Sequence, residues 1–304
     1  MTRDFLSVDD ISSEELHMLL ERAAKMKQSP TDDASRLTGK QIAVIFEKPS
    51  TRTRVSFEVG ISSMGGHAVI LSSTELQLGR GESIEDTGRV MTRYVDAIVV
   101  RTFGQERLEA LASTAEVPVV NALSDYEHPC QTLADLMTIQ EHKGDPKGLT
   151  LAYLGDGNNV AHSLLLGGAK LGMRVRVATP PGFEPIPQVV ERANEIGEET
   201  GGAAEVTNDP KAAVEGADVL YTDVWASMGQ EEEHSERVLV FTPYRLDGAA
   251  VDRAADDVIV LHCLPAHRGE EITDDVIDGP HSVVWDQAEN RLHTQKALLA
   301  WLLG

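Results

Sequence analysis

Short apolar runs alternate with amphipathic helical patterns along the whole chain of 304 residues, and this alternation constrains the fold more than any other feature. In the first half the runs predict strands at 41–46, 67–71, 97–101 and 117–121. In the second half they predict strands at 149–154, 174–178, 219–221, 258–261 and 282–285. Strands separated by helices are typical of parallel sheets that carry helices on both faces. The sequence therefore predicts an α/β protein.

A cluster of turn-forming residues, Lys-Gly-Asp-Pro-Lys-Gly at 143–148, separates the two halves. A chain of this length is long enough for two domains. We expect a first domain at 1–146 and a second, Rossmann-like domain at 147–286, each a parallel sheet flanked by helices. Apolar side chains at helical spacing predict a terminal helix within 287–304, and we expect this helix to pack back on the first domain.

The starts of several helices follow from local signals. Ser12 and Glu15 have the spacing of a capping box, in which each side chain accepts a backbone N–H from the other residue. Ser50 is placed to cap a helix that runs to about Met64 and ends at a glycine pair. Pro129 suits the first turn of another helix, which we expect to end near residue 142.

The chain carries 49 acidic and 27 basic side chains, which gives a formal net charge of −22. This excess repels nucleic acid and anionic membrane surfaces, so neither is an expected partner. No apolar run approaches the roughly 18 residues that a membrane helix needs. The acidic N-terminal segment is unlike a signal peptide. We therefore expect a soluble, cytoplasmic protein.

The two cysteines, Cys130 and Cys263, are far apart, and no Cys-x-x-Cys pair occurs. A disulfide framework needs more cysteines, and a structural zinc site needs about four ligands. Lysine supplies only nine of the 27 basic residues. A lysine-poor, carboxylate-rich surface suits concentrated salt, which screens self-repulsion. We expect no disulfide scaffold, no metal site and a salt-adapted (halophilic) protein.

A polar segment, Ser-Thr-Arg-Thr-Arg at 50–54, stands where a predicted strand ends and a helix begins. A helix start offers unpaired backbone N–H groups and the positive end of the helix dipole. Hydroxyl groups add hydrogen bonds, and guanidinium groups grip phosphate oxygens in a fork. The segment predicts a phosphate site, although a capped helix with surface arginines is the structural alternative. A P-loop is excluded, because the glycine-rich run and the Gly-Lys-Ser/Thr ending are absent.

Two motifs follow other predicted strands. His128 and Gln131 stand in His-Pro-Cys-Gln at a strand-to-helix turn. Ligands of open α/β sheets bind at the carboxyl ends of strands, so both side chains are candidates for the same site. Cys263 stands in His-Cys-Leu-Pro at 262–265. For each motif taken alone, a turn residue without a role, or a small buried thiol, is the structural alternative.

The segment Gly-Asp-Gly-Asn-Asn at 155–159 also follows a predicted strand, but it does not complete a dinucleotide fingerprint. Val160 occupies the position of the third glycine, and no acidic residue ends the next strand. A nucleotide-dependent dehydrogenase is therefore disfavoured. Asn158 and Asn159 instead suit an amino or carboxylate group of a substrate. Asp223, after a later strand, suits a cationic amine or simply caps a helix.

Taken together, these motifs resemble those of the ornithine carbamoyltransferases, within the aspartate/ornithine carbamoyltransferase superfamily. The segments 50–54 and 128–131 are similar to motifs of carbamoyltransferases generally. The segments 223–229 and 262–265 resemble the ornithine branch. Aspartate-using relatives usually carry proline at the position of Cys263, and putrescine-using relatives usually differ at Ser-Met-Gly, 227–229. The resemblance runs from residue 46 to residue 291.

The resemblance implies transfer of a carbamoyl group from carbamoyl phosphate to the δ-amino group of L-ornithine, giving L-citrulline and phosphate, with no cofactor. It implies carbamoyl phosphate contacts at Ser50, Thr51, Arg52, Thr53, Gln77, Arg101, His128, Gln131, Cys263, Leu264 and Arg291. It implies ornithine contacts at Asn159, Asp223, Ser227 and Met228. The catalytic residues that it implies are Cys263, Arg101 and His128, without a covalent intermediate.

Gln77 resembles a residue that a neighbouring subunit supplies, so the resemblance also implies a homotrimer, alone or assembled further. Binding is expected to close the two domains and the loop at 227–229 over the substrates. Two alternatives stay open. One is a carbamoyltransferase that uses putrescine or aspartate as acceptor. The other is a non-catalytic phosphate- or amino-acid-binding protein, which would have no need for His128, Gln131 and Cys263 together.

Overall fold

The structure is a computed structural model that describes residues 3–72, 81–226 and 234–304. The chain divides into two compact units, one of residues 1–134 with 290–304 and one of residues 135–289. The division falls within helix α5 (Pro129–Lys143) and within helix α12 (Val284–Leu302). None of the helices in the described residues has the length and apolar character that a membrane span requires.

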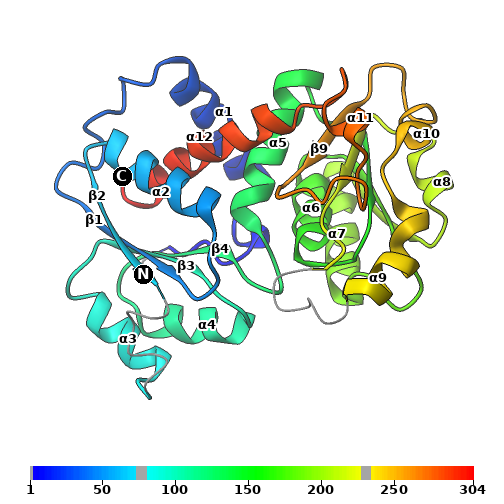
Figure 1. Cartoon of the computed structure of the whole chain (residues 1–304). Helices are drawn as coiled ribbons and strands as arrows, with labels where there is room; N and C mark the ends of the chain where they lie inside the picture. Colours follow the sequence, from blue (N-terminus) through cyan, green and yellow to red (C-terminus); the bar gives the residue numbers. More distant parts are fainter. Residues whose placement is uncertain (1–2, 73–80, 227–233) are drawn as a thin grey trace. The chain divides into compact units, whose positions relative to one another are not determined.

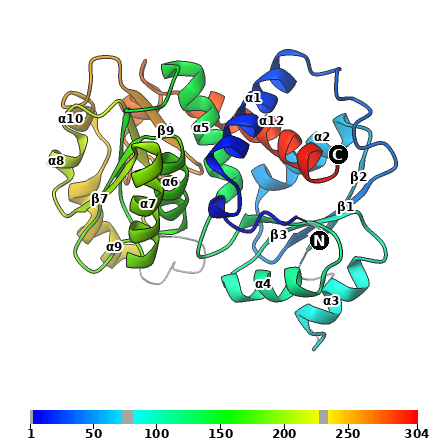
Figure 2. The same ribbon diagram turned by 180° about the vertical axis from the view of Figure 1, so that it is seen from behind.

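The first unit is built on a parallel sheet with the strand order β2-β1-β3-β4. Its strands are β1 (Gln41–Phe46), β2 (His67–Ser72), β3 (Ala97–Arg101) and β4 (Val119–Leu123). Its helices are η1 (Val8–Asp10), α1 (Ser13–Gln28), α2 (Thr51–Ser63), α3 (Ile84–Met91) and α4 (Gln105–Thr114), with the start of α5 and the end of α12. Figures 1 and 2 show α1, α2 and α12 over one face of this sheet and α3 and α4 over the other.

The second unit is built on a parallel sheet with the strand order β7-β6-β5-β8-β9. Its strands are β5 (Thr150–Leu154), β6 (Arg174–Ala178), β7 (Ala203–Thr207), β8 (Val219–Thr222) and β9 (Ile259–His262). Its helices are α6 (Asn159–Lys170), α7 (Pro187–Thr200), α8 (Pro210–Val214), α9 (His234–Phe241), η4 (Thr242–Tyr244), α10 (Gly248–Val251) and α11 (Asp274–Ile277). The predicted class, two parallel sheets flanked by helices, is confirmed.

The central strands are buried because they are apolar on both faces, as parallel sheets covered by helices require. In the first unit, Ile45 of β1 and Val100 of β3 pack with Leu108 and Leu111 of α4. In the second unit, alternate residues of β5, Ala152 and Leu154, pack in one core with α8 and α11. Each sheet therefore has its own core.

Local capping signals position the helices that matter for the site. The Ser12 and Glu15 side chains form the expected capping box at the start of α1. The Ser50 side chain caps α2, where its Oγ accepts the Thr53 N–H at 3.4 Å. Helix α5 begins at Pro129, as predicted, and ends at Lys143. These sequence-based predictions are confirmed.

Two expectations about strands need correction. The predicted strand at 282–285 is wrong, because Ser282 forms only an isolated bridge with Val260 and α12 already begins at Val284. A short apolar run such as Val283-Val284-Trp285 fits a strand and a buried helix end equally well. Strand β7 was not predicted. It lies at the sheet edge, where only Ala204 is buried, so it lacks a strong apolar signal.

The strand order places a topological switch point in each sheet. In the first unit the chain runs from β1 out to β2 and then returns to β3 on the other side of β1. In the second unit it runs from β5 out to β7 and returns to β8 on the other side of β5. Ligands of such sheets bind beyond the carboxyl ends of the strands at these points. The segments after β1, β3, β5 and β8 are therefore the expected ligand-binding segments.

Candidate active site

The segment after β1 forms a hydroxyl-lined helix start in the first unit. Ser50 Oγ donates a hydrogen bond of 3.0 Å to Oγ1 of Thr53, whose side chain is fully buried. Arg291, on α12, donates to the same Thr53 oxygen at 2.8 Å. The two hydroxyls are thus ordered before any ligand binds. A helix start with ordered hydroxyls and a guanidinium is suited to an anion.

Positive charge gathers around His128 at this end of the sheet. Arg101 ends β3 and pairs in register with Phe46, so it lies beside the end of β1. Burial of His128, and then the charges of Arg291, Arg101 and Arg52, hold the pKa of its imidazole well below the usual range. His128 is therefore neutral at physiological pH. A neutral imidazole is able to donate one hydrogen bond to a substrate oxygen without adding charge.

The remaining residues predicted for the phosphate site are placed differently. Gln131 is buried in the first turn of α5, and its N–H donates to the carbonyl of His128, which directly precedes the helix, at 3.0 Å. Thr51 and Arg54 are exposed. Arg54 lies 3.6 Å from the Glu58 carboxylate and is not among the cations that depress the pKa of His128. Arg54 therefore contributes less local positive charge than its place in the motif suggests.

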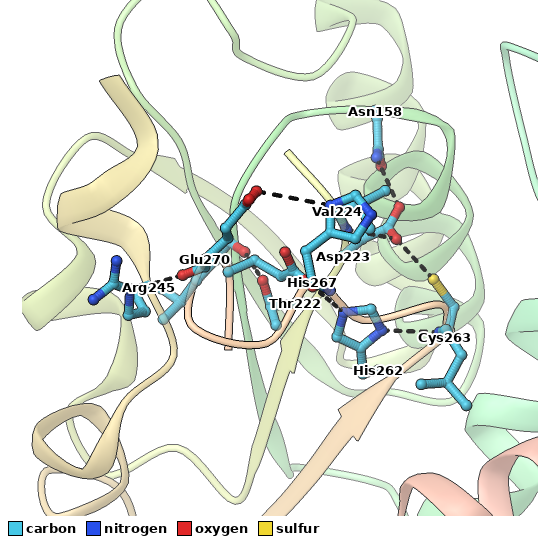
Figure 3. A network of polar contacts seen from close by, with 12 residues as sticks. Asn158, Thr222, Asp223, Val224, Arg245, His262, Cys263, His267 and Glu270 are labelled. Atoms are coloured by element: carbon cyan, nitrogen blue, oxygen red, sulfur yellow. Dashed lines mark hydrogen bonds and ion pairs between the residues drawn. The ribbon is translucent and has the colours of Figure 1, made fainter. Parts of the chain in front are cut away.

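The second unit carries a hydrogen-bond network centred on Asp223, after β8 (Figure 3). Asp223 Oδ2 accepts from Asn158 Nδ2 at 3.0 Å. Asp223 Oδ1 accepts from the Val224 N–H at 2.8 Å and from Cys263 Sγ at 2.9 Å. Three donors stabilise a carboxylate in a buried position, where an unpartnered charge is costly. Asp223 therefore offers a fixed negative charge for an amine.

The register of two neighbouring strands explains why Asp223 and Cys263 meet. Thr222 of β8 pairs with His262 of β9, so the residues that follow them leave the sheet side by side. Asn158 caps α6, where its Oδ1 accepts the N–H groups of Val160 and Ala161, and this fixes its amide toward Asp223. Leu264 follows Cys263 with a left-handed φ of 58°.

Both ring nitrogens of His262 form hydrogen bonds, and one of them holds this turn. Its Nδ1 accepts the Leu264 N–H at 2.8 Å, so the proton of a neutral ring lies on Nε2, which is 3.0 Å from Glu271 Oε1. Asp223, His262 and Cys263 each have an atom of metal-ligand type within 4.8 Å of the others. Because both ring nitrogens of His262 already have partners, the geometry favours a hydrogen-bond network over a metal centre.

Several predicted site residues need separate mention. Asn159 is the first residue of α6, directly after Asn158. Gln77, Ser227 and Met228 lie outside the described residues. Cys130, which received no role, is fully buried, and burial raises the pKa of its thiol to about 12. It is therefore an inert packing residue.

The sequence reasoning missed a buried ion pair beside this network. Arg237 of α9 donates at 2.7 Å to Asp156 Oδ2 and at 2.8 Å to the Trp225 carbonyl. Burial raises the pKa of Asp156, and the bond from Arg237 opposes that shift. The pair ties α9 and the Trp225 backbone to the turn after β5. The only sequence signal was an aspartate between two glycines at a strand end.

Comparison with known proteins identifies the family. Residues 3–141 match the family model described as aspartate/ornithine carbamoyltransferase, carbamoyl-P binding domain. Residues 147–302 match the model described as aspartate/ornithine carbamoyltransferase, Asp/Orn binding domain. The chain therefore belongs to the aspartate/ornithine carbamoyltransferase family of enzymes.

Full-length relatives refine this assignment. An ornithine carbamoyltransferase of Parafrankia sp. (strain EAN1pec) is 61% identical, with 99% of this chain and 96% of the relative covered. The solved ornithine carbamoyltransferase from Pyrococcus furiosus is 55% identical, with a TM-score of 0.95 over 98% of this chain and 96% of that one. The Thermus thermophilus structure of the same name is 44% identical, with a TM-score of 0.91 and both chains fully covered. Within the family, the chain groups with the ornithine carbamoyltransferases.

Proposed function

We propose that this enzyme transfers the carbamoyl group of carbamoyl phosphate to the δ-amino group of L-ornithine, giving L-citrulline and phosphate in a reversible reaction of arginine metabolism. The observation that carries the phosphate half is the convergence of Arg52, Arg101 and Arg291 on a neutral His128. The observation that carries the amine half is the hydrogen bond between Cys263 and Asp223.

For carbamoyl phosphate, we assign the phosphate group to the start of α2. The backbone N–H groups of Ser50, Thr51 and Arg52 and the Thr53 hydroxyl, whose proton is not used in the bonds from Ser50 and Arg291, suit a phosphate dianion. Arg52 and Arg291 neutralise its charge as it leaves. Gln77 is proposed to add a contact to the same ligand.

The carbamoyl end is assigned to His128, Gln131 and Arg101. As the amine attacks, negative charge develops on the carbonyl oxygen, and donors that are already fixed in a buried site stabilise that charge most effectively. Thr53, Arg101 and His128 supply such donors. A neutral His128 adds a hydrogen bond at this oxygen, while Arg101 adds the positive charge. Cys263 and Leu264 are assigned to the other side of the carbamoyl group.

For ornithine, Asp223 is proposed as the partner of a cationic amine, with Asn159, Ser227 and Met228 as the other contacts. Only the neutral δ-amine is a nucleophile, so a proton must leave it before attack. We assign Cys263 the positioning of that amine and the relay of its proton: as Sγ takes the proton from the amine, the thiol proton passes along its hydrogen bond to Asp223 Oδ1. Carbamoyl phosphate is already activated, so the step needs no acyl-cysteine. Productive attack requires the reacting atoms to approach within about 3–3.5 Å.

The assembly and setting of the enzyme are also proposals. Because Gln77 resembles a residue contributed across a subunit boundary, we propose a homotrimer with shared sites, in the cytoplasm. The excess of carboxylates supports adaptation to concentrated salt. Sedimentation and activity from dilute buffer to molar salt test both points. A monomer with full activity contradicts the shared site, and full stability in dilute buffer contradicts salt adaptation.

The acceptor is the point at which the proposal differs from its main alternative. We would measure phosphate release from carbamoyl phosphate with ornithine, putrescine or aspartate as the acceptor, in concentrated salt. The proposal predicts turnover with ornithine alone. Turnover with putrescine or aspartate would support the carbamoyl phosphate site and reject the assignment of the Asp223 network to ornithine. Binding of carbamoyl phosphate without turnover by any acceptor would favour the non-catalytic binding protein.

A further inference from the structure

Gln287, in the first turn of α12, lies at the centre of a buried hydrogen-bond cluster behind the Asp223–Cys263 pair. Its Oε1 accepts the His262 N–H at 2.8 Å. Its Nε2 donates to Asp135 Oδ1 at 2.7 Å and to the Tyr221 hydroxyl oxygen at 3.1 Å. The Tyr221 hydroxyl in turn donates to Asp135 Oδ2 at 3.2 Å. Each of these four residues is at most 1% exposed.

The position of β9 explains what the amide oxygen does. Strand β9 is the edge of its sheet, so within residues 3–72, 81–226 and 234–304 no strand neighbours one side of its backbone. Along that side, Val260 is satisfied by a single bridge to Ser282. Two residues further on, the His262 N–H points the same way, because alternate residues of a strand face the same edge. The Gln287 side chain accepts this N–H and therefore fixes the last strand residue before Cys263.

The amide nitrogen holds the neighbouring strand in the same way. Tyr221 stands in β8 two residues before Asp223, and burial, followed by the charge of Asp135, raises its pKa well above the usual range. The Tyr221 hydroxyl therefore keeps its proton and donates it to Asp135. One glutamine side chain thus links the ends of β8 and β9. A fully satisfied polar cluster without access to water is rigid, and a partly satisfied one is costly.

We propose that Gln287 is a positioning residue that sets the hydrogen bond between Cys263 Sγ and Asp223 Oδ1. It contacts neither reacting atom. It acts by holding the His262 backbone and the Tyr221 hydroxyl. Cys263 is the residue after His262, and Asp223 lies two residues after Tyr221. The expected change in the KM for ornithine rests on the proposed carbamoyl transfer to ornithine. The expected change in the reactivity of the Cys263 thiol does not depend on that function.

The reactivity of the Cys263 thiol is the most direct readout. A thiol that donates to a carboxylate is held in its neutral form, because the thiolate would face a like charge. Thiolate is the form that alkylating reagents attack. Loosening the pair therefore raises the rate of alkylation by iodoacetamide at neutral pH. The Cys263→Ser variant measures the background from Cys130, which is fully buried.

The test uses the full-length protein and three substitutions. Gln287→Met keeps the length of the side chain and removes both hydrogen-bonding functions. Gln287→Glu keeps an oxygen for the His262 N–H but replaces the amide donor to Asp135 by a second carboxyl group, so it separates the two contacts. Val214→Ala removes methyl groups from a buried apolar position on α8, and serves as a control for a loss of packing stability. Unfolding temperatures are measured for all three.

We expect the alkylation rate at pH 7.5 to rise at least about threefold in Gln287→Met, to rise less in Gln287→Glu, and to stay unchanged in Val214→Ala. The KM for ornithine rises in the same order, and by a larger factor than the KM for carbamoyl phosphate. An unchanged alkylation rate in a folded Gln287→Met protein overturns the proposal. If that protein does not fold, Tyr221→Phe replaces it, with a smaller rise expected and an unchanged rate again decisive. If the variants change the alkylation rate as expected but the wild-type protein does not carbamoylate ornithine, the positioning role stands and only the proposed function is contradicted.

Discussion

Arg291 donates a hydrogen bond of 2.8 Å to the hydroxyl oxygen of Thr53, although 238 positions separate the two residues in the chain. Both side chains are buried. The last helix of the chain therefore completes the hydroxyl-lined helix start that follows the first strand. The proposed phosphate site at 50–54 therefore includes a residue that no local sequence pattern attaches to it.

If Arg291 orders Thr53 for phosphate, the two side chains act as one element. We predict that Arg291→Met and Thr53→Val each lower kcat/KM for carbamoyl phosphate about ten- to a hundredfold, because hydrogen bonds to charged groups contribute about 1.5–3 kcal/mol. The double variant is expected to be little worse than Arg291→Met alone. Steady-state kinetics of the three variants measure this coupling. Fully additive losses would show that the two residues act independently.

His128 gives a prediction about pH and stability. Its pKa is held well below the unfolded value of about 6.5. The unfolded chain therefore binds a proton that the folded chain does not, and stability is lost as the pH falls from about 6.5 through the folded pKa. We expect His128→Gln to reduce the fall in the free energy of unfolding over this range. Urea unfolding from pH 7.5 down to pH 5 measures it, and an identical pH dependence in wild type and variant would contradict the predicted neutral imidazole.

The Asp223–Cys263 pair predicts separate effects on the two substrates. Asp223→Asn keeps the shape of the side chain but loses its charge. We expect its kcat/KM for ornithine to fall at least about thirtyfold, in line with the 2 kcal/mol or more lost when one partner of a buried charge pair is removed. The KM for carbamoyl phosphate should not change. Equal loss for both substrates would indicate a general structural defect.

The Cys263→Ser variant tests whether the reaction has a covalent step. A serine at this position keeps a hydroxyl donor for Asp223 but transfers protons less readily than a thiol. We predict that Cys263→Ser lowers kcat about a hundredfold, at the low end of general acid–base effects, without abolishing turnover. Mass spectrometry of the wild-type protein quenched during turnover should show no carbamoyl adduct on Cys263. Detection of such an adduct at a rate that matches turnover would contradict the direct attack by the amine.

The Asp156–Arg237 pair predicts a specific rescue. Its side chains are only 16% and 10% exposed, and removing one member of a buried pair leaves an uncompensated charge that costs about 3–5 kcal/mol. We expect Arg237→Met to lower the unfolding temperature strongly and Asp156→Asn to recover part of that loss in the double variant. Calorimetry of the two single variants and the double variant decides this. A double variant less stable than Arg237→Met would show that the ion pair is not the source of the loss.

The central strands and the helix starts were predictable because their signals are local. The strand at 41–46 is apolar and buried from Ile42 to Phe46, and Ser50 can cap only a helix that follows it. The edge strand β7 was not predictable, because a strand exposed on most of its surface needs no apolar run. The run at 282–285 was misassigned, because its three apolar residues, Val283, Val284 and Trp285, do not distinguish a strand from the first turn of α12.

For the site, too, the features with a local sequence signal were predictable and the contacts between distant segments were not. The positions of His128 and Asp223 were predictable, because each follows the carboxyl end of a strand in its own parallel sheet, whereas their roles stay predictions. The support around them was not, because it depends on contacts between distant segments. The His262–Glu271 contact, the Arg237–Asp156 pair and the Gln287 cluster all join different elements. Only the folded chain shows that Asn158 serves Asp223, whereas the sequence suggested a direct contact with substrate.

The most direct test of carbamoyl transfer to ornithine is the bond that forms. Wild-type enzyme would be given carbamoyl phosphate labelled with carbon-13 and ornithine labelled with nitrogen-15 at the δ position, and the product followed by NMR. The proposed reaction predicts a one-bond carbon–nitrogen coupling in citrulline that appears with time, and a severe loss of its rate in Arg52→Ala. Release of phosphate with the carbon label in carbamate or cyanate alone, and no coupling to nitrogen, would contradict it.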